Sequence, residues 1–170
     1  IRMIKRFGTT VLYAVTNYHF RVAEVAKQLG ENLRNSSLRV GICVAEMPTD
    51  PQIERLRNEL GYETIILDYG ATEFPGFSVN CRIDRKVHHV WSDYYLVEVV
   101  DVETQEPLQQ GERGELVITS LQREAFPLIR YLSRDITDYV GFEQCDCGST
   151  HPKIGAEIDR KDFMTKVRGT

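Results

Sequence analysis

The sequence predicts an α/β fold in two parts: a parallel, doubly wound half-sheet over about residues 1–76, and a mostly antiparallel β subdomain over about residues 77–158. Two observations lead to this prediction. In the first part, continuous apolar runs alternate with segments of helical periodicity, which is typical of parallel strands covered on both faces. Beyond Gly76 the helical period disappears, and strand-like stretches follow one another between polar turns.

In the first part we expect strands and helices to alternate. Residues 9–15 are β-branched and apolar and predict a strand, and from about Tyr18 the apolar residues recur at helical spacing. A second apolar run, 38–45, predicts another strand. A Pro-Thr-Asp-Pro turn then opens a short helix that ends at Gly61, and a third strand is expected at 62–67.

In the second part we expect strands at 94–102, 114–120 and 136–142, because β-branched and apolar residues dominate these stretches. Residues 104–113 are polar and predict a hairpin connection without chemistry of its own.

The composition is that of a globular protein, with 42% hydrophobic and 27% charged residues among 170. A formal net charge of −4 gives no basic stripe for a phosphate backbone, so we expect no nucleic acid as a partner. No apolar run approaches the roughly 20 residues that cross a bilayer, so we expect no membrane segment and a cytoplasmic location. Because the chain starts at Ile1 without a methionine, we expect a piece of a longer protein.

The run Tyr-Gly-Ala-Thr-Glu at 69–73 follows an apolar strand, at the place where open α/β sheets bind their ligands. The ring of Tyr69 can lie against a base, and Gly70 and Ala71 allow close approach of the backbone. The Thr72 hydroxyl can donate to a phosphate oxygen, and the Glu73 carboxylate can hold Mg²⁺. An ordinary exit from a strand into a turn is the alternative.

Two of the four cysteines, Cys145 and Cys147, share one tight polar turn. Two thiolates so placed supply half of a tetrahedral zinc site. Cys81 and His89 are the best remaining donors, with His88 and His151 as rivals. Such a site would be structural, closed by four protein ligands; the alternative is reduced surface thiols and a histidine with a packing role. Cys43, inside an apolar run, is predicted to be a buried small hydrophobe.

Four blocks in fixed order carry a family resemblance, with the Cys145-x-Cys147 turn between the third and the fourth: 69–73, 111–119, 129–137 and 159–164. In this order they resemble the phenylacetate-CoA ligase branch of the adenylate-forming (acyl-CoA synthetase, AMP-binding) superfamily, including the coenzyme F390 synthetase-like proteins. Relatives in this branch also have a similar Cys and His placement before a Trp-x-Asp run like the one at Trp91.

The resemblance implies a two-step reaction in which ATP and a carboxylic acid, most simply an aromatic one, give an acyl-adenylate, and coenzyme A then takes the acyl group. It implies that residues 1–158 are part of the large domain and that 159–170 are the hinge and the start of a C-terminal domain. The family's upstream phosphate loop and downstream catalytic lysine are not in this sequence, so we expect the chain alone to be inactive. Family members are often dimers, which makes a homodimer an expectation.

The resemblance also assigns residue roles. Tyr69 would stack on adenine, Thr72 would bond the α-phosphate and Glu73 would hold Mg²⁺. Asp135, reached through Arg134, would accept both ribose hydroxyls. The alternative for Asp135 is a helix or turn cap.

At the end of the chain, Arg160 would contact the nucleotide and Asp162 would be the hinge between half-reactions. The alternative is a solvated ion pair between the two. Asp159 and Phe163 depart from the family pattern, which usually has a glycine and a second acid there.

The segment 16–20 falls where this family lines its acyl pocket, and Tyr18 and His19 are the candidates, with a core role as the alternative. Ala45 and Glu46 belong to the same predicted pocket. Val44 replaces the glycine that usually precedes this Ala-Glu pair, and the triplet Phe-Pro-Gly at 74–76 is also unusual, so the acid stays open.

Two hypotheses follow from the sequence. The first is a fragment of an ATP-dependent acyl- or aryl-CoA ligase. The second is a non-catalytic, zinc-stabilised interaction or nucleotide-sensing domain that has kept the fold.

Overall fold

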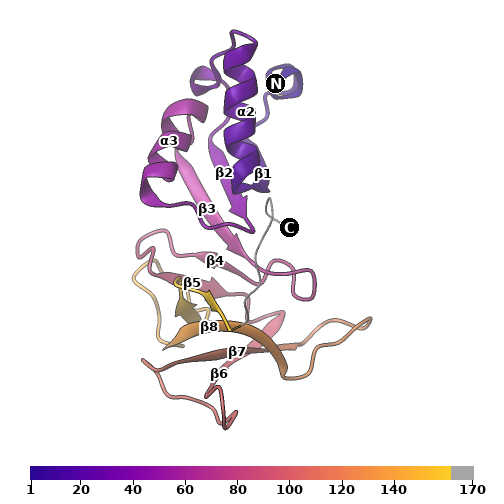
Figure 1. The fold of residues 1–170 in the computed structure, drawn as a ribbon, viewed down its shortest axis with the longest axis vertical. Coiled ribbons are helices and arrows are strands. Elements are labelled where there is room, and N and C mark those ends of the chain that lie inside the picture. The colour runs from indigo at the N-terminus through magenta and orange to yellow at the C-terminus, as the bar shows by residue number, and fades with distance from the viewer. Residues whose placement is uncertain (162–170) are drawn as a thin grey trace. The chain divides into compact units, whose positions relative to one another are not determined.

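A computed structural model of the protein describes residues 1–161. The chain folds as two compact units (Figure 1): unit 1 is Ile1–Tyr69, and unit 2 begins at Gly70. The change from one unit to the other therefore falls inside the 69–73 run rather than near residue 76.

Unit 1 contains a parallel sheet in the order β1-β2-β3, as the apolar runs predicted. The strands are in register, with Val11 beside Val40 and Val40 beside Thr64. The elements of unit 1 are α1 (Arg2–Phe7), β1 (Val11–Val15), α2 (Thr16–Gln28), a 3-10 turn (Leu33–Asn35), β2 (Val40–Val44), α3 (Asp50–Leu60) and β3 (Thr64–Tyr69).

Local sequence explains where the helices of unit 1 begin and end. α3 starts with a capping box between Thr49 and Gln52 and stops at Gly61, whose φ of 76° suits glycine. A Cβ at Gly61 would lie 2.4 Å from the carbonyl oxygen of Arg34, so no larger residue fits there. α2 follows β1 directly at Thr16, two residues before the predicted start.

Unit 2 is an antiparallel sheet in the order β4-β5-β9-β8-β7-β6, with the short β10 on β8. The three longer strands were predicted, although β8 begins at residue 131 rather than 136. The strands of unit 2 are β4 (Ser78–Asn80), β5 (Val87–Val90), β6 (Tyr95–Val100), β7 (Arg113–Ser120), β8 (Tyr131–Gly141), β9 (Lys153–Gly155) and β10 (Asp159–Arg160).

A bulge interrupts the pairing of β7 with β8. Glu115 lies opposite Ile136, whereas Val117 lies opposite Leu132, so β8 carries extra residues between these two pairs. Arg134, at the centre of the bulge, has a φ of 63°. Bulges redirect side chains and are common beside functional sites, and this one sets the direction of the residues around it.

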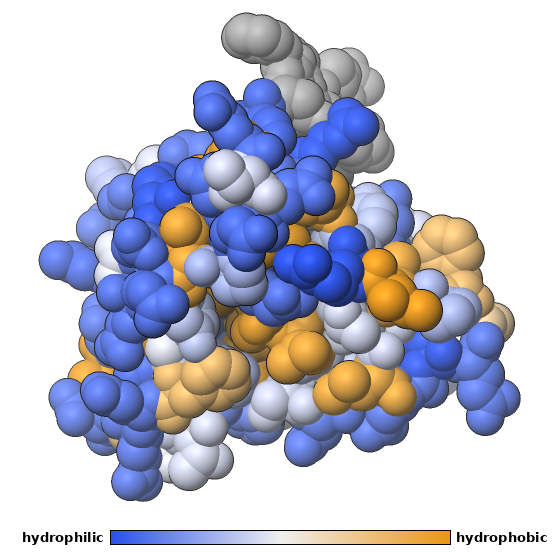
Figure 2. All heavy atoms as spheres, turned by 90° about the horizontal axis from the view of Figure 1, so that it is seen from below, coloured by the Kyte–Doolittle hydropathy of each residue, from blue (hydrophilic) through white to orange (hydrophobic). Residues whose placement is uncertain are grey.

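Among residues 1–161, no helix is long and apolar enough to cross a membrane. Seen from below in the orientation of Figure 1, hydrophobic side chains lie in small groups between hydrophilic ones (Figure 2).

Candidate nucleotide site and metal cluster

The first turn of unit 2 is tight and depends on a glycine. The amide of Phe74 donates to the carbonyl oxygen of Ala71 at 3.1 Å, which closes the turn. A Cβ on Gly70 would lie 2.9 Å from the carbonyl oxygen of Phe74, closer than side chains tolerate. The Phe74 ring anchors the turn, because it is 2% exposed and contacts Phe77 edge to face.

This turn presents the two residues predicted to meet phosphate and Mg²⁺. Thr72 is exposed and Glu73 is half-buried. The guanidinium of Arg123 donates to the carbonyl oxygen of Glu73, which adds a positive charge beside the turn. Tyr69 is the last residue of β3 in unit 1 and is half-buried.

Asp135 occupies the β8 bulge and faces Arg160. Arg160 lies opposite Asp135 in the β8–β10 pairing, and its Nη1 is 2.9 Å from Asp135 Oδ1. The Asp135 side chain is 7% exposed and that of Arg160 31%, so the carboxylate is largely withdrawn from water. Ser133 fixes the backbone, because its hydroxyl donates to the carbonyl oxygen of Leu116 at 2.8 Å and accepts from the Asp135 amide at 3.1 Å.

The structure bears on one alternative from the sequence: Asp135 lies in strand β8 and is not a helix cap. Arg160 pairs with Asp135, and this contact does not test the alternative ion pair between Arg160 and Asp162. The proposed hinge residue, Asp162, lies outside the described residues.

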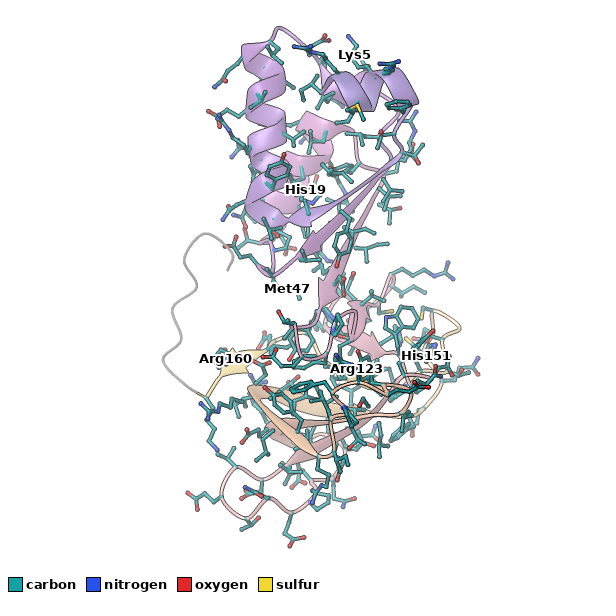
Figure 3. The ribbon with its side chains drawn as sticks, turned by 90° about the vertical axis from the view of Figure 1, so that its right-hand side faces the viewer. Lys5, His19, Met47, Arg123, His151 and Arg160 are labelled. Carbon is teal, nitrogen blue, oxygen red and sulfur yellow. The ribbon has the colours of Figure 1, made fainter. Side chains whose placement is uncertain are left out.

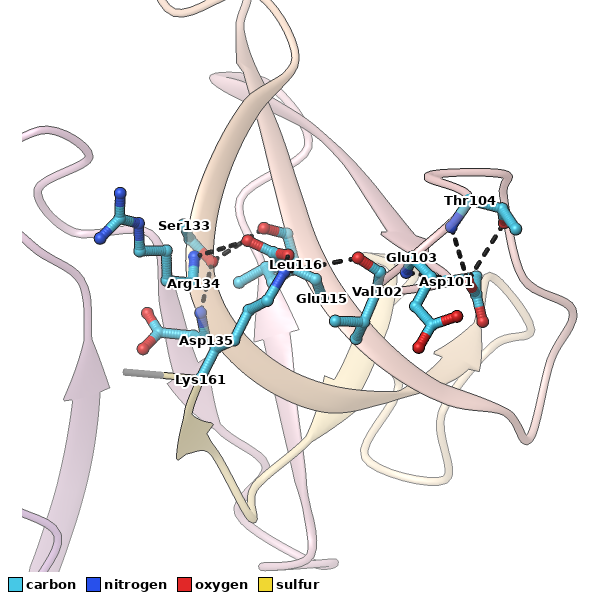
Figure 4. Close-up of polar contacts among 10 residues, drawn as sticks. All are labelled: Asp101, Val102, Glu103, Thr104, Glu115, Leu116, Ser133, Arg134, Asp135 and Lys161. Carbon is cyan, nitrogen blue, oxygen red and sulfur yellow. Dashed lines mark hydrogen bonds and ion pairs between the residues drawn. The ribbon is translucent and has the colours of Figure 1, made fainter. Parts of the chain in front are cut away.

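Glu115 and Lys161 form a second pair at the same bulge (Figure 4). Glu115 is 2% exposed; its Oε1 accepts from the Arg134 amide at 3.2 Å, and its Oε2 is 3.0 Å from Lys161 Nζ. The Lys161 amide also donates to the carbonyl oxygen of Arg134 at 2.8 Å. Sequence reasoning assigned no role to either residue, although Glu115 lies in the second of the four family blocks.

An open pocket of about 750 Å³ lies beside this pair. Its wall combines charged and apolar side chains from β7, β8 and the segment before β8. It is lined by Glu115, Ile129, Arg130, Tyr131, Leu132, Arg134 and Lys161.

The predicted acyl-pocket residues lie in unit 1, after the carboxyl ends of β1 and β2. Tyr18 is 55% exposed, Ala45 is exposed with a φ of 66°, and Glu46 is half-buried. Asn17 Nδ2 lies 2.6 Å from Glu46 Oε2, and this bond ties the start of α2 to the loop after β2. Strained backbone beside the carboxyl edge of a parallel sheet is typical of a binding region.

His19 is a core residue instead of a pocket residue (Figure 3). Its ring is fully buried, with Nδ1 2.8 Å from the Tyr62 hydroxyl and Nε2 3.1 Å from the carbonyl oxygen of Ile42. Since a carbonyl only accepts, Nε2 carries the proton and Nδ1 accepts from Tyr62. Burial lowers the pKa of His19. The position of His19 near the start of α2 does not show from the sequence alone whether its side chain enters the core or a ligand pocket.

The structure brings the four predicted zinc ligands together in unit 2. The donor atoms of Cys81, His89, Cys145 and Cys147 all lie within 4.8 Å of one another. Burial opposes ionisation of Cys81, but backbone amides at 83 and 84, helped by His89 and Cys145, outweigh it and lower the pKa of Cys81 to about 6.

The two rival histidines have other environments. His88 Nδ1 is 3.3 Å from the Ser78 hydroxyl, and burial lowers the pKa of His88 to about 4. His151 Nδ1 is 3.0 Å from the Ser92 hydroxyl, and its ring meets Trp91 edge to face at 5.2 Å.

Residues 1–122 match the family of AMP-binding enzymes, which is most of the 170-residue chain. The chain belongs to the AMP-binding enzyme family. It is 35% identical to the phenylacetate-coenzyme A ligase of Thermus thermophilus and 32% identical to that of Escherichia coli K12, in each case over 99% of this chain. The chain spans 38% of the length of both relatives.

A solved structure of 2-hydroxyisobutyryl-CoA ligase in complex with 2-HIB-AMP and CoA is similar to this chain with a TM-score of 0.87 and 25% identity. The match covers 99% of this chain and 36% of that one. A luciferase-like enzyme from the mealworm Zophobas morio, at 17% identity and a TM-score of 0.60, shares the fold. These likenesses confirm the predicted α/β class.

Proposed function

We propose that this protein acts as an AMP-forming acid–thiol ligase of the phenylacetate-CoA ligase type. A carboxylate oxygen attacks the α-phosphorus of ATP, the acyl–oxygen–phosphorus link forms, and pyrophosphate leaves. The coenzyme A thiol then loses its proton and attacks the acyl carbon, the thioester forms, and AMP leaves with the oxygen that came from the acid. The acid is proposed to be aromatic.

The observation that carries the proposal is the Asp135–Arg160 pair at the β8 bulge. Arg134, a non-glycine residue, has a φ of 63°, and the Asp135 carboxylate is nearly buried. Both features lower the stability of the fold, and such destabilising features are typical of functional sites. The named relatives, which match over 99% of this chain, support the ligase and disfavour the non-catalytic alternative.

In this proposal Asp135 accepts hydrogen bonds from the ribose hydroxyls, for which a carboxylate is a natural partner. Arg160 holds that carboxylate in position and adds a cation beside the nucleotide. Arg134 contributes through its left-handed backbone, which turns the strand so that Asp135 is presented.

The turn after β3 supplies the remaining nucleotide contacts. Tyr69 stacks on adenine, and Gly70 and Ala71 let the backbone approach. Thr72, which is exposed, donates its hydroxyl proton to the α-phosphate.

Glu73 is the proposed Mg²⁺ ligand. It offers one half-buried carboxylate, which fits an ion that takes one or two protein carboxylates together with substrate phosphates. Bound there, Mg²⁺ would neutralise charge on the phosphates as pyrophosphate leaves.

Tyr18, Ala45 and Glu46 are the proposed wall of the acyl pocket. All three follow the carboxyl ends of parallel strands, and the Glu46–Asn17 hydrogen bond keeps their two segments together. A cytoplasmic location, where ATP and coenzyme A are found, and a homodimeric assembly remain part of the proposal.

The test is acid-dependent release of pyrophosphate from ATP and Mg²⁺, measured on the full-length protein with phenylacetate, benzoate, 2-hydroxyisobutyrate and acetate. We expect release with at least one acid, fastest with an aromatic one, and coenzyme A-dependent formation of AMP. Nucleotide binding without release for any carboxylic acid would instead favour the non-catalytic domain.

A further inference from the structure

Four metal-ligand side chains converge in unit 2 from three separate segments. Cys81 follows β4, His89 lies in β5, and Cys145 and Cys147 belong to the loop between β8 and β9. Cys81 and His89 are buried, and the other two are half-buried. Chance proximity of one pair would need no explanation, but here every donor lies within 4.8 Å of the other three.

The distances fit one tetrahedral ion. Two thiolates about 2.3 Å from a tetrahedral zinc ion stand about 3.8 Å apart. Cys81 Sγ and Cys145 Sγ are 3.7 Å apart. A thiolate and an imidazole nitrogen on the same ion stand about 3.6 Å apart, and Cys147 Sγ is 3.3 Å from His89 Nε2.

The same distances do not describe a disulfide, in which the two sulfurs are about 2.05 Å apart. A disulfide between Cys81 and Cys145 would also leave unexplained why Cys147 Sγ and His89 Nε2 lie 3.3 Å apart beside it. A metal ion uses all four donors.

Backbone groups support the thiolates. The amides of Ile83 and Asp84 both donate to Cys81 Sγ, each at 3.4 Å. In the loop, the Gly148 amide donates to the carbonyl oxygen of Cys145 at 2.8 Å, and Gly148 has a φ of 88° that suits glycine. In this turn, Cys147 Sγ lies 3.3 Å from His89 Nε2, and Cys145 Sγ lies 3.7 Å from Cys81 Sγ.

We propose that this cluster is a structural zinc site with three thiolates and one imidazole, His89 binding through Nε2. Soft sulfur donors in a tetrahedral array select zinc over Mg²⁺, and four protein ligands leave no position for substrate. The ion ties the β8–β9 loop to β5 and to the end of β4. Its role is to stabilise unit 2, and it does not depend on the proposed ligase activity.

Elemental analysis and X-ray absorption on untagged protein test the site directly. We expect about one zinc per chain, with three sulfurs at about 2.3 Å and one nitrogen at about 2.0–2.1 Å. Absence of metal, a shell made of nitrogen and oxygen only, or a Cys81–Cys145 disulfide found by peptide mapping of protein kept under reducing conditions would each overturn the proposal.

Variants locate the ion. Cys147→Ser is expected to lose most of the zinc, whereas Asp146→Ser and His151→Gln, from the same loop, are expected to keep about one equivalent. If Cys147→Ser does not fold, the wild type decides: removal of the metal by a chelator should lower the melting temperature, and added zinc should restore it. Unchanged zinc in Cys147→Ser, or a melting temperature insensitive to chelation, would contradict the site.

Discussion

Asp135 on β8 and Arg160 on β10 lie opposite each other in the strand pairing, with Nη1 and Oδ1 2.9 Å apart. The pair therefore joins the β8 bulge to the last described residues of the chain. In the proposed function, a carboxylate whose position is already fixed in this way would lose little entropy on accepting hydrogen bonds from the ribose hydroxyls.

Asp135→Ala in the full-length protein should raise the ATP concentration needed for half-maximal pyrophosphate release at least tenfold. The reason is that the ribose hydroxyls lose their acceptor while the fold keeps its strand. Initial rates over a range of ATP concentrations measure this.

The matched control is Asp138→Asn, further along β8, where the side chain is 42% exposed and paired with Arg113. We expect its ATP dependence to stay within about twofold of wild type. An unchanged ATP requirement in Asp135→Ala would show that the ribose assignment is wrong.

Gly70→Ala should lower both the rate of adenylate formation and the melting temperature. The added Cβ would lie 2.9 Å from the carbonyl oxygen of Phe74, so the turn that carries Thr72 and Glu73 must shift. The rate and the melting temperature should be measured on the same preparation. Gly148→Ala is not a suitable control, because Gly148 has a positive φ that alanine rarely adopts. A wild-type rate in Gly70→Ala would show that this turn takes no part in adenylate formation.

Lys161→Met should destabilise the protein by about 1–2 kcal/mol, because Glu115 is left as a buried carboxylate with one charge partner fewer. Lys161→Arg, which keeps the charge, should cost less. Urea unfolding of the three proteins provides the comparison, and equal stabilities would mean that the pair contributes nothing.

Stability should fall as the pH drops below about 6.5, the value for histidine in an unfolded chain. Burial lowers the pKa of His19 in the folded protein, so the unfolded chain binds a proton first and unfolding becomes easier on the acid side. The extra slope is at most about 1.4 kcal/mol per pH unit for one proton.

His19→Gln should show a flatter pH dependence of the unfolding free energy between pH 7.5 and 5.5 than wild type. Parallel curves for the two proteins would contradict a titrating role for His19.

The sequence predicted unit 1 well, because its strands are continuous apolar runs and α3 has both a capping box and a terminal glycine. β5 and β9 were not predicted, because they are short and form by pairing with strands distant in the sequence, such as His88 with Ile154. Strands of this kind have too few residues to show a period.

Among the site residues, the clustering of Cys81, His89, Cys145 and Cys147 could be predicted, because few residue types bind zinc and two of these four share one turn. His19 could not be placed, since only the Tyr62 hydroxyl and the Ile42 carbonyl, both distant in sequence, show that it belongs to the core. The Glu115–Lys161 pair depends on the bulge in β8, and no local sequence pattern predicts that bulge.

Glu73→Gln should reduce acyl-adenylate formation more strongly than nucleotide binding, because the carboxylate acts mainly as charge develops on the departing pyrophosphate. Glu124→Gln, an exposed residue of the same unit, is the control and should keep the wild-type rate. Equal rates for both variants would remove Glu73 from the mechanism.

Transfer of oxygen-18 tests the central claim most directly. The full-length protein is incubated with ATP, Mg²⁺, coenzyme A and a carboxylic acid that carries oxygen-18 in both carboxylate oxygens. The masses of the products are then measured by mass spectrometry. Attack of the acid on the α-phosphorus predicts one labelled oxygen in AMP and none in pyrophosphate. Label in inorganic phosphate with ADP as the other product, or thioester formed with unlabelled AMP, would contradict an acyl-adenylate intermediate.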